Sequence, residues 1–164
     1  MTLATLFDPF GRWNMPSWQT IPLRLIVGFG FMQHGYAKLA RGPDNFVRIL
    51  QALHVPMPLL AAWATILTEL IGGAAILLGV FVALAAIPMI AVLLVAIFTV
   101  HLPNGFSSIK LMSVDMAGAH FGQPGYECDL LYVACIVAIV FAGPGRFSLD
   151  RVILRRLGVS GRAD

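Results

Sequence analysis

The chain has 164 residues, of which 59% are hydrophobic and 12% are charged, and its mean hydropathy is +0.84. Because a soluble domain has about a quarter of its residues charged, this composition excludes an ordinary soluble protein. The net charge of +3 comes mostly from arginines after Gly145, as in the cytoplasmic flank of a membrane protein, which argues against nucleic-acid binding. We therefore predict one integral membrane domain, residues 1–164.

Four apolar segments predict membrane-spanning helices, at about residues 21–39, 58–81, 83–100 and 126–141. The first opens with Pro22, which the first turn of a helix tolerates. The third has no charged residue and holds Pro88, which predicts a kink. The fourth is slightly short for a span and stops before a Gly-Pro-Gly sequence. The expected fold class is all-α, an integral membrane four-helix bundle.

Short amphipathic helices are expected outside the spans. After the first span, Phe46, Val47, Leu50 and Leu53 fall largely on one side of a helix, which predicts an interfacial helix in the first outer loop. The C-terminal tail, residues 147–157, has a similar pattern. Residues 79–82 join the second and third spans almost without a loop, whereas residues 101–125, rich in Gly, Pro, Ser and Asn, predict a long loop.

The basic residues predict how the chain is oriented. Four spans place both termini on one side, which holds seven arginines: Arg12, Arg24, Arg146, Arg151, Arg155, Arg156 and Arg162. The other side holds four basic residues: Lys38, Arg41, Arg48 and Lys110. By the positive-inside rule, both termini are expected in the cytoplasm, and residues 40–58 and 101–125 face outward.

Polar and ionisable side chains recur in the outer half of the predicted spans, where facing lipid would be costly. His34 and Lys38 are four residues apart on one helix face, and Glu69 lies roughly 15 Å into the second span by helical rise. His101 ends the third span, and Tyr126 and Glu127 begin the fourth. We expect these side chains to point into the bundle and to form a shared polar pocket.

Several of these residues also have a simpler interpretation. Lys38 could extend to the interface as an anchor, His34 could bond a backbone carbonyl, and water could satisfy His101 and Glu127. Glu69 must be protonated or paired at its depth, and its available partners are Lys38, His34 and Arg24. Arg24 itself is expected to reach lipid phosphates. No tight spacing of ligands predicts a metal site, and Cys128 and Cys135 are interpreted as packing residues.

The sequence also resembles a known family. The motifs "RLIVGFGFMQHGYAKL", "TELIGGAAILLG", "VHLPNGF", "GYE" and "GPGRFSLDR" occur in the order and spacing of the DoxX family of small four-span bacterial membrane proteins. The resemblance covers about residues 20–152 and implies a bundle in the bacterial inner membrane. It adds Asn104, in "VHLPNGF", to the candidate residues. Named relatives include a subunit of a thiosulfate:quinone oxidoreductase, and other members act beside soluble redox enzymes.

The resemblance implies a membrane subunit or partner of an oxidoreductase system, with a quinone as the implied cofactor. The candidate catalytic residues are His34 and Glu69, which would relay protons, and Lys38, which would fix an anionic or carbonyl oxygen. The candidate quinone- or substrate-binding set is His34, Lys38, Glu69, His101, Asn104, Tyr126 and Glu127. The alternatives are a non-catalytic scaffold or assembly factor, and a small-solute transporter that would need further copies of the chain.

Overall fold

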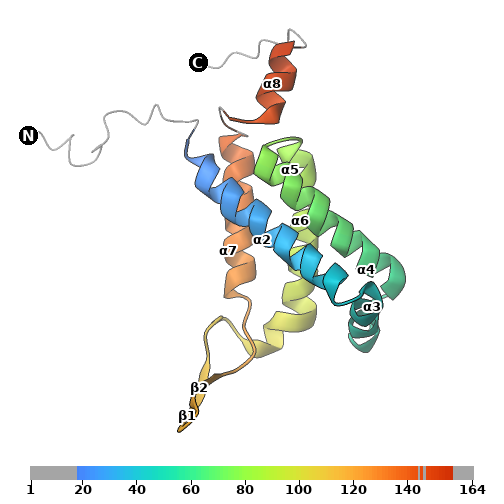
Figure 1. Ribbon diagram of the computed structural model, residues 1–164, viewed down its shortest axis with the longest axis vertical. Helices are drawn as coiled ribbons and strands as arrows, with labels where there is room; N and C mark the ends of the chain where they lie inside the picture. The colour runs from blue at the N-terminus through green and yellow to red at the C-terminus, as the bar shows by residue number, and fades with distance from the viewer. Residues whose placement is uncertain (1–17, 144, 146, 157–164) are drawn as a thin grey trace, which may run out of the picture.

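The computed structural model describes residues 18–143, 145 and 147–156. Within them, four helical segments follow one another (Figure 1). They are α2 (Thr20–Ala40); α4 (Pro58–Leu67) continued by the π-helix η1 (Thr68–Gly72) and α5 (Gly73–Leu78); α6 (Val82–Ala96) continued by the π-helix η2 (Ile97–His101); and α7 (Glu127–Ala142). The mainly helical fold is confirmed, with bounds close to those of the predicted spans.

The four segments share one apolar core. It is built from every segment and consists of Val27, Phe31, Ile76, Val82, Ala86, Met89, Leu93, Ile136 and Ile139. α2 and α5 cross closely at a pair of glycines, where a Cβ atom on Gly28 would lie 2.7 Å from the carbonyl oxygen of Gly73. Only glycine allows the two backbones to approach so closely, and this approach fixes the height at which α2 passes η1.

The outer surface of the helices is apolar. Large side chains that point away from the core are widely exposed, such as Leu84 at 67% and Phe141 at 86%. Within the described residues, two helical stretches, Pro58–Leu78 and Val82–Asn104, are long and apolar enough to cross a membrane. The other two helices, α2 with the charged residues Arg24 and Lys38 and α7 with 16 residues, are not among these stretches. An apolar exterior around helices of this length is the surface of a membrane protein.

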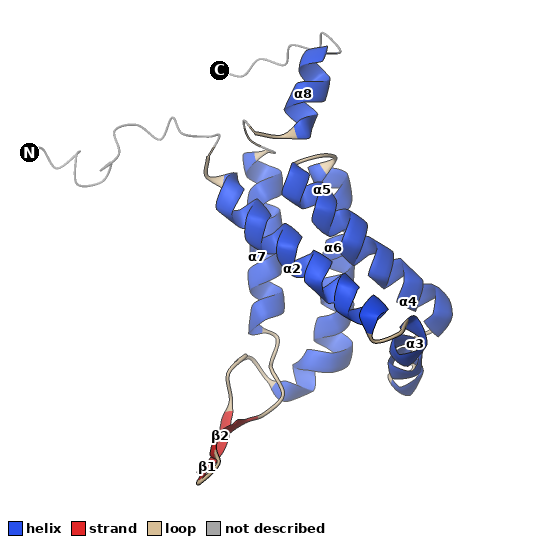
Figure 2. Cartoon of the chain, viewed as in Figure 1, coloured by secondary structure: helices blue, strands red, loops and turns tan. Residues whose placement is uncertain are grey.

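Two predicted amphipathic helices are present as α3 (Pro43–Ala52), which packs against α4, and α8 (Leu149–Arg156). The prediction of a long loop at residues 101–125 is partly wrong. It contains a short 3₁₀ turn η3 (Leu102–Asn104) and an antiparallel hairpin of β1 (Leu111–Asp115) and β2 (Gly118–Phe121). Figure 2 shows this hairpin at the end of the molecule opposite α8. On the hairpin, a hydrogen bond from His120 lowers the pKa of Asp115 below its ordinary value.

Arg24 does not reach for lipid phosphates, and that expectation is wrong. Its side chain is buried. The guanidinium donates hydrogen bonds to the carbonyl oxygens of Ile76 (3.0 Å) and Leu77 (2.8 Å) at the end of α5, and to that of Phe147 (2.9 Å) before α8. Carbonyls at a helix C-terminus have no partner within the helix, so Arg24 satisfies them and ties α2 to both elements.

Candidate functional site

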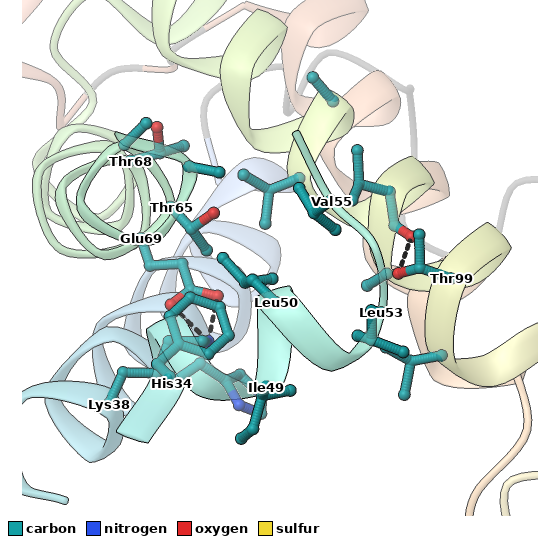
Figure 3. A pocket seen from close by; sticks show the side chains of 18 of the residues that line it. His34, Lys38, Ile49, Leu50, Leu53, Val55, Thr65, Thr68, Glu69 and Thr99 are labelled. Carbon is teal, nitrogen blue, oxygen red and sulfur yellow. Dashed lines mark hydrogen bonds and ion pairs between the residues drawn. The ribbon is translucent and has the colours of Figure 1, made fainter. Parts of the chain in front are cut away.

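A cavity of about 630 Å³ lies among α2, α3, the α4–η1 segment and the α6–η2 segment. Most of its wall is apolar and comes from α3, α4 and α6, for example Leu50, Ala64 and Val92. Four of the candidate residues line it: His34, Lys38, Glu69 and His101. Figure 3 shows His34, Lys38 and Glu69 gathered at one end, with Leu50, Leu53 and Val55 beyond them.

Lys38 and Glu69 form an ion pair at this end of the cavity. The ammonium Nζ lies 2.7 Å from each carboxylate oxygen, and Glu69 is only 5% exposed. Lys38 also lies 5.1 Å from the centroid of the Phe46 ring on α3. Of the partners considered for Glu69, the structure therefore selects Lys38, and this contact replaces the interpretation of Lys38 as an interfacial anchor.

The local backbone explains why Glu69 can reach Lys38. Glu69 lies in the wide turn of η1, and π-helical turns are often found at functional sites. Gly35 on α2 faces this turn, since a Cβ atom there would lie 3.1 Å from Cβ of Glu69. A larger residue at position 35 would push η1 away from α2, and with it the carboxylate from the ammonium.

His101 forms a second pair, with a residue that the sequence analysis missed. Its Nδ1 lies 2.5 Å from Oδ2 of Asp129 on α7. Asp129 is only 8% exposed, and His101 is the last residue of the π-helix η2. Asp129 stands 7 and 10 residues before the core residues Ile136 and Ile139, which places it on the buried face of α7, but because this helix is apolar on all sides its sequence gives no clear signal of that face.

His34 lies on α2 one turn before Lys38 and lines the cavity. Its ring makes no hydrogen bond to any side chain or backbone group in the described part of the chain. It lies within electrostatic range of Lys38, Asp129 and His101. The imidazole is thus placed where a molecule in the cavity could contact it, and the alternative of a bond to a backbone carbonyl is not observed.

The remaining three candidates lie outside the cavity lining and hold the segment before α7. Asn104 donates to the carbonyl oxygens of Val100 (3.3 Å) and Pro124 (3.2 Å). A carboxylate oxygen of Glu127 accepts from the backbone N–H of Ser108 at 3.0 Å. The ring of Tyr126 packs edge-on against Phe106. These contacts position the hairpin segment relative to α7 and leave the cavity to the other four residues.

The described residues contain no group of three or more His, Cys, Asp or Glu side chains that could hold a metal ion. Both cysteines are free thiols; Cys128 is exposed and Cys135 is half-buried. The ionisable groups that line the cavity are two imidazoles, an ammonium and one carboxylate, which can donate, accept and exchange protons.

An apolar exterior around a cavity lined by an ion pair and two histidines defines a helical membrane protein with an internal polar site. A DoxX family model matches residues 20–102, from α2 to the end of η2, and the chain belongs to the DoxX family. His34, Lys38, Glu69 and His101 all lie within the matched residues, whereas Asp129 lies beyond them.

The chain also resembles a curated protein. An uncharacterized membrane protein of Mycobacterium tuberculosis is 29% identical over 149 residues, which are 86% of this chain and 85% of that protein. No solved structure matches the chain.

Proposed function

We propose that this protein is the membrane subunit or partner of an oxidoreductase system and that it binds a quinone in the cavity. The observation that supports this function is the cavity itself, with apolar walls and proton-exchanging groups that converge on it. A volume of about 630 Å³ is within the range of roughly 300–1,000 Å³ that is usual for small-molecule sites.

The chemistry of a quinone matches this lining. Its ring is flat and apolar and suits the walls made by Leu50, Ala64 and Val92. Its oxygens need hydrogen-bond donors. The Lys38 ammonium has three N–H groups, of which Glu69 engages two, so that the third is left for a ligand oxygen. His34, with no partner among the described residues, provides a proton donor or acceptor beside it.

We also propose that α2 and α7 cross the membrane together with the two helices that meet the length and composition of a span. Phe31 of α2 and Ile136 of α7 belong to the same core as Ile76 and Met89, so all four segments pack along one another. The bundle would lie in a bacterial inner membrane with both termini in the cytoplasm, as the arginine distribution predicts.

The test is a binding titration on the purified protein in detergent with a ubiquinone or menaquinone analogue. We expect saturable binding to the wild type and roughly tenfold weaker binding to Glu69→Gln, about 1.4 kcal/mol, because the Lys38 ammonium loses the carboxylate that holds it in place for the ligand oxygen. Glu127→Gln is the matched control, since that carboxylate lies outside the cavity lining, and it should bind as the wild type does. Absence of saturable binding to the wild type would refute the proposal.

A scaffold or assembly role is the second candidate, and the hairpin favours it. Met112, Val114 and Met116 on β1 and its turn are strongly exposed, at 71%, 69% and 105%. In that role the charged pairs would only stabilise the bundle. Lys38 and Glu69 variants would then lower the melting temperature, while the wild type would bind no quinone. Small-solute transport is the third hypothesis, and uptake into proteoliposomes tests it.

A further inference from the structure

The pair formed by His101 and Asp129 has no part in the function proposed above. The two residues come from η2 and α7, 28 positions apart in the sequence. Their side chains are 26% and 11% exposed, so water reaches this contact only partly. When Asp129 is ionised its oxygen can only accept hydrogen bonds, and the ring nitrogen that faces it, Nδ1, then carries the hydrogen.

This contact determines what the other ring nitrogen can do. His101 lines the cavity, and its Nε2 makes no hydrogen bond within the described part of the chain. In the neutral ring with Nδ1–H on Asp129, Nε2 has a free lone pair, and in the protonated ring it carries an N–H. Nε2 can therefore gain or lose a proton while the bond to Asp129 holds the ring in place.

We propose that Nε2 of His101 exchanges a proton with a quinone bound in the cavity, and that Asp129 is the positioning residue that fixes the tautomer and orientation of the ring. This inference rests on the proposed function. In the reducing direction the oxidoreductase partner supplies two electrons, and the quinone takes up two protons to become a quinol. The Nε2–H bond of the imidazolium breaks and an O–H bond forms at the nearer quinone oxygen. His34 supplies the second proton to the other oxygen.

The charges around the cavity are consistent with this assignment. α2 contributes His34 and Lys38, η1 contributes Glu69, and α7 contributes Asp129, whereas α3 lines the cavity with apolar side chains only. Glu69 offsets the charge of Lys38 within one pair. Asp129 offsets the charge that His101 gains on protonation, so His101 can hold a proton without a net increase in unpaired charge.

The first experiment measures the tautomer directly and needs no quinone. Histidine rings are labelled with ¹⁵N, and the His101 signals are assigned by their loss in His101→Gln. We expect the neutral His101 ring to carry its proton on Nδ1 in the wild type. In Asp129→Asn the amide can donate to Nδ1, so the proton should move to Nε2, as happens when an Asp that orients a catalytic His is made Asn. Asp129→Glu should restore the wild-type tautomer.

The second experiment measures quinone-analogue affinity against pH. Asp129→Asn should bind roughly tenfold more weakly and lose the pH dependence that the wild type shows, whereas Asp129→Glu should recover both. Glu127→Gln, two residues away on the same helix, should match the wild type. Circular dichroism and melting temperature establish that each variant is folded.

The outcomes separate the two proposals. An Asp129→Asn protein that binds quinone with the wild-type tautomer and pH profile overturns the assignment of Asp129 and His101 while leaving the proposed function intact. A wild-type protein that binds no quinone overturns the proposed function and this inference together.

Discussion

The ion pair of Lys38 and Glu69 shows how this fold provides a buried carboxylate with a positively charged partner. Glu69 stands in the middle of an apolar segment and is nearly inaccessible, so its carboxylate needs a positive partner. Lys38 approaches from α2 because Gly35 lets η1 come close. Both oxygens are engaged by one ammonium, which leaves neither of them unsatisfied.

We expect Lys38→Met to destabilise the protein by about 3 kcal/mol, since it leaves a buried carboxylate without its partner. The double variant Lys38→Met with Glu69→Gln should recover at least half of this loss, because the neutral amide no longer needs a cation. Thermal unfolding in detergent measures both. Arg41→Met, which removes an exposed cation at the end of the same helix, is the control. Equal stability of the single and double variants would contradict the pairing.

Depth along a helix could be predicted from the sequence, but rotation about its axis could not. Counting residues placed His34, Lys38, Glu69 and His101 at similar depths, and the structure brings all four to one cavity. Two acidic residues lie at the start of α7, of which Glu127 is a candidate from the sequence and Asp129 is not. Their side chains point about 200° apart around the helix. Because α7 is apolar on all sides, its sequence does not show clearly which of the two faces the bundle.

At the scale of elements, distant motifs meet at the end of the bundle that carries α8. Arg24 of α2 bonds the last carbonyls of α5. Gly79 follows with φ +67°, and a Cβ atom there would lie 2.7 Å from Cζ of Arg24. Asp150 of α8 donates its backbone N–H to the carbonyl oxygen of Gly79 at 3.1 Å and accepts from the N–H of Phe81 at 3.0 Å. This junction, formed by Arg24, Gly79 and Asp150, fixes where α8 begins.

We expect Arg24→Met to lower the free energy of unfolding by about 3 kcal/mol, since it removes charge-assisted hydrogen bonds to buried carbonyls. α8 should also detach more often, so that trypsin cleaves faster at Arg151. Gel analysis of timed digests measures this rate, and thermal unfolding in detergent measures the stability.

Arg24→Lys should be intermediate, because an ammonium cannot reach three carbonyls in the fork geometry of a guanidinium. Arg48→Met on α3, at an exposed position, is the control. An unchanged digestion rate in Arg24→Met would show that Arg24 does not hold α8.

Long apolar elements were predictable, whereas the hairpin was not. The helices follow from apolar runs of nearly constant composition, which only a helix can place in a bilayer. The segment at residues 101–125 has many turn residues, which obscured the short strands at Leu111–Asp115 and Gly118–Phe121. These strands bury little and, among the described residues, pair with each other alone, so no amphipathic pattern marked them. Likewise, the role of Arg24 depends on carbonyls from α5 and the tail, which sequence spacing alone does not bring together.

At the scale of the whole molecule, the structure has two distinct ends. α8 and the start of α2 lie at one end, and α3 and the β1–β2 hairpin lie toward the other (Figure 1). Positive charge in the sequence is concentrated at the α8 end. Lys38, His101 and Asp129 lie near the ends of their helices that are closer to the hairpin, and Glu69 lies near the middle of the Pro58–Leu78 segment. If the termini are cytoplasmic, as proposed above, the cavity would lie nearer the outer face of the membrane, and protons would be exchanged with that side.

Labelling of single cysteines tests this orientation. Cys128 is exposed at the start of α7, next to the hairpin segment, so Cys135→Ser leaves one thiol at the outer end. We expect a membrane-impermeant maleimide to label it in intact spheroplasts. The matched variant has both native cysteines replaced by Ser and carries Val152→Cys on α8, where the native side chain is 47% exposed. It should react only after the membrane is permeabilised. The reverse pattern would place the termini outside. If both positions were labelled from outside, Cys128 and α8 would lie on the same side of the membrane, and α7, which connects them, could not span it.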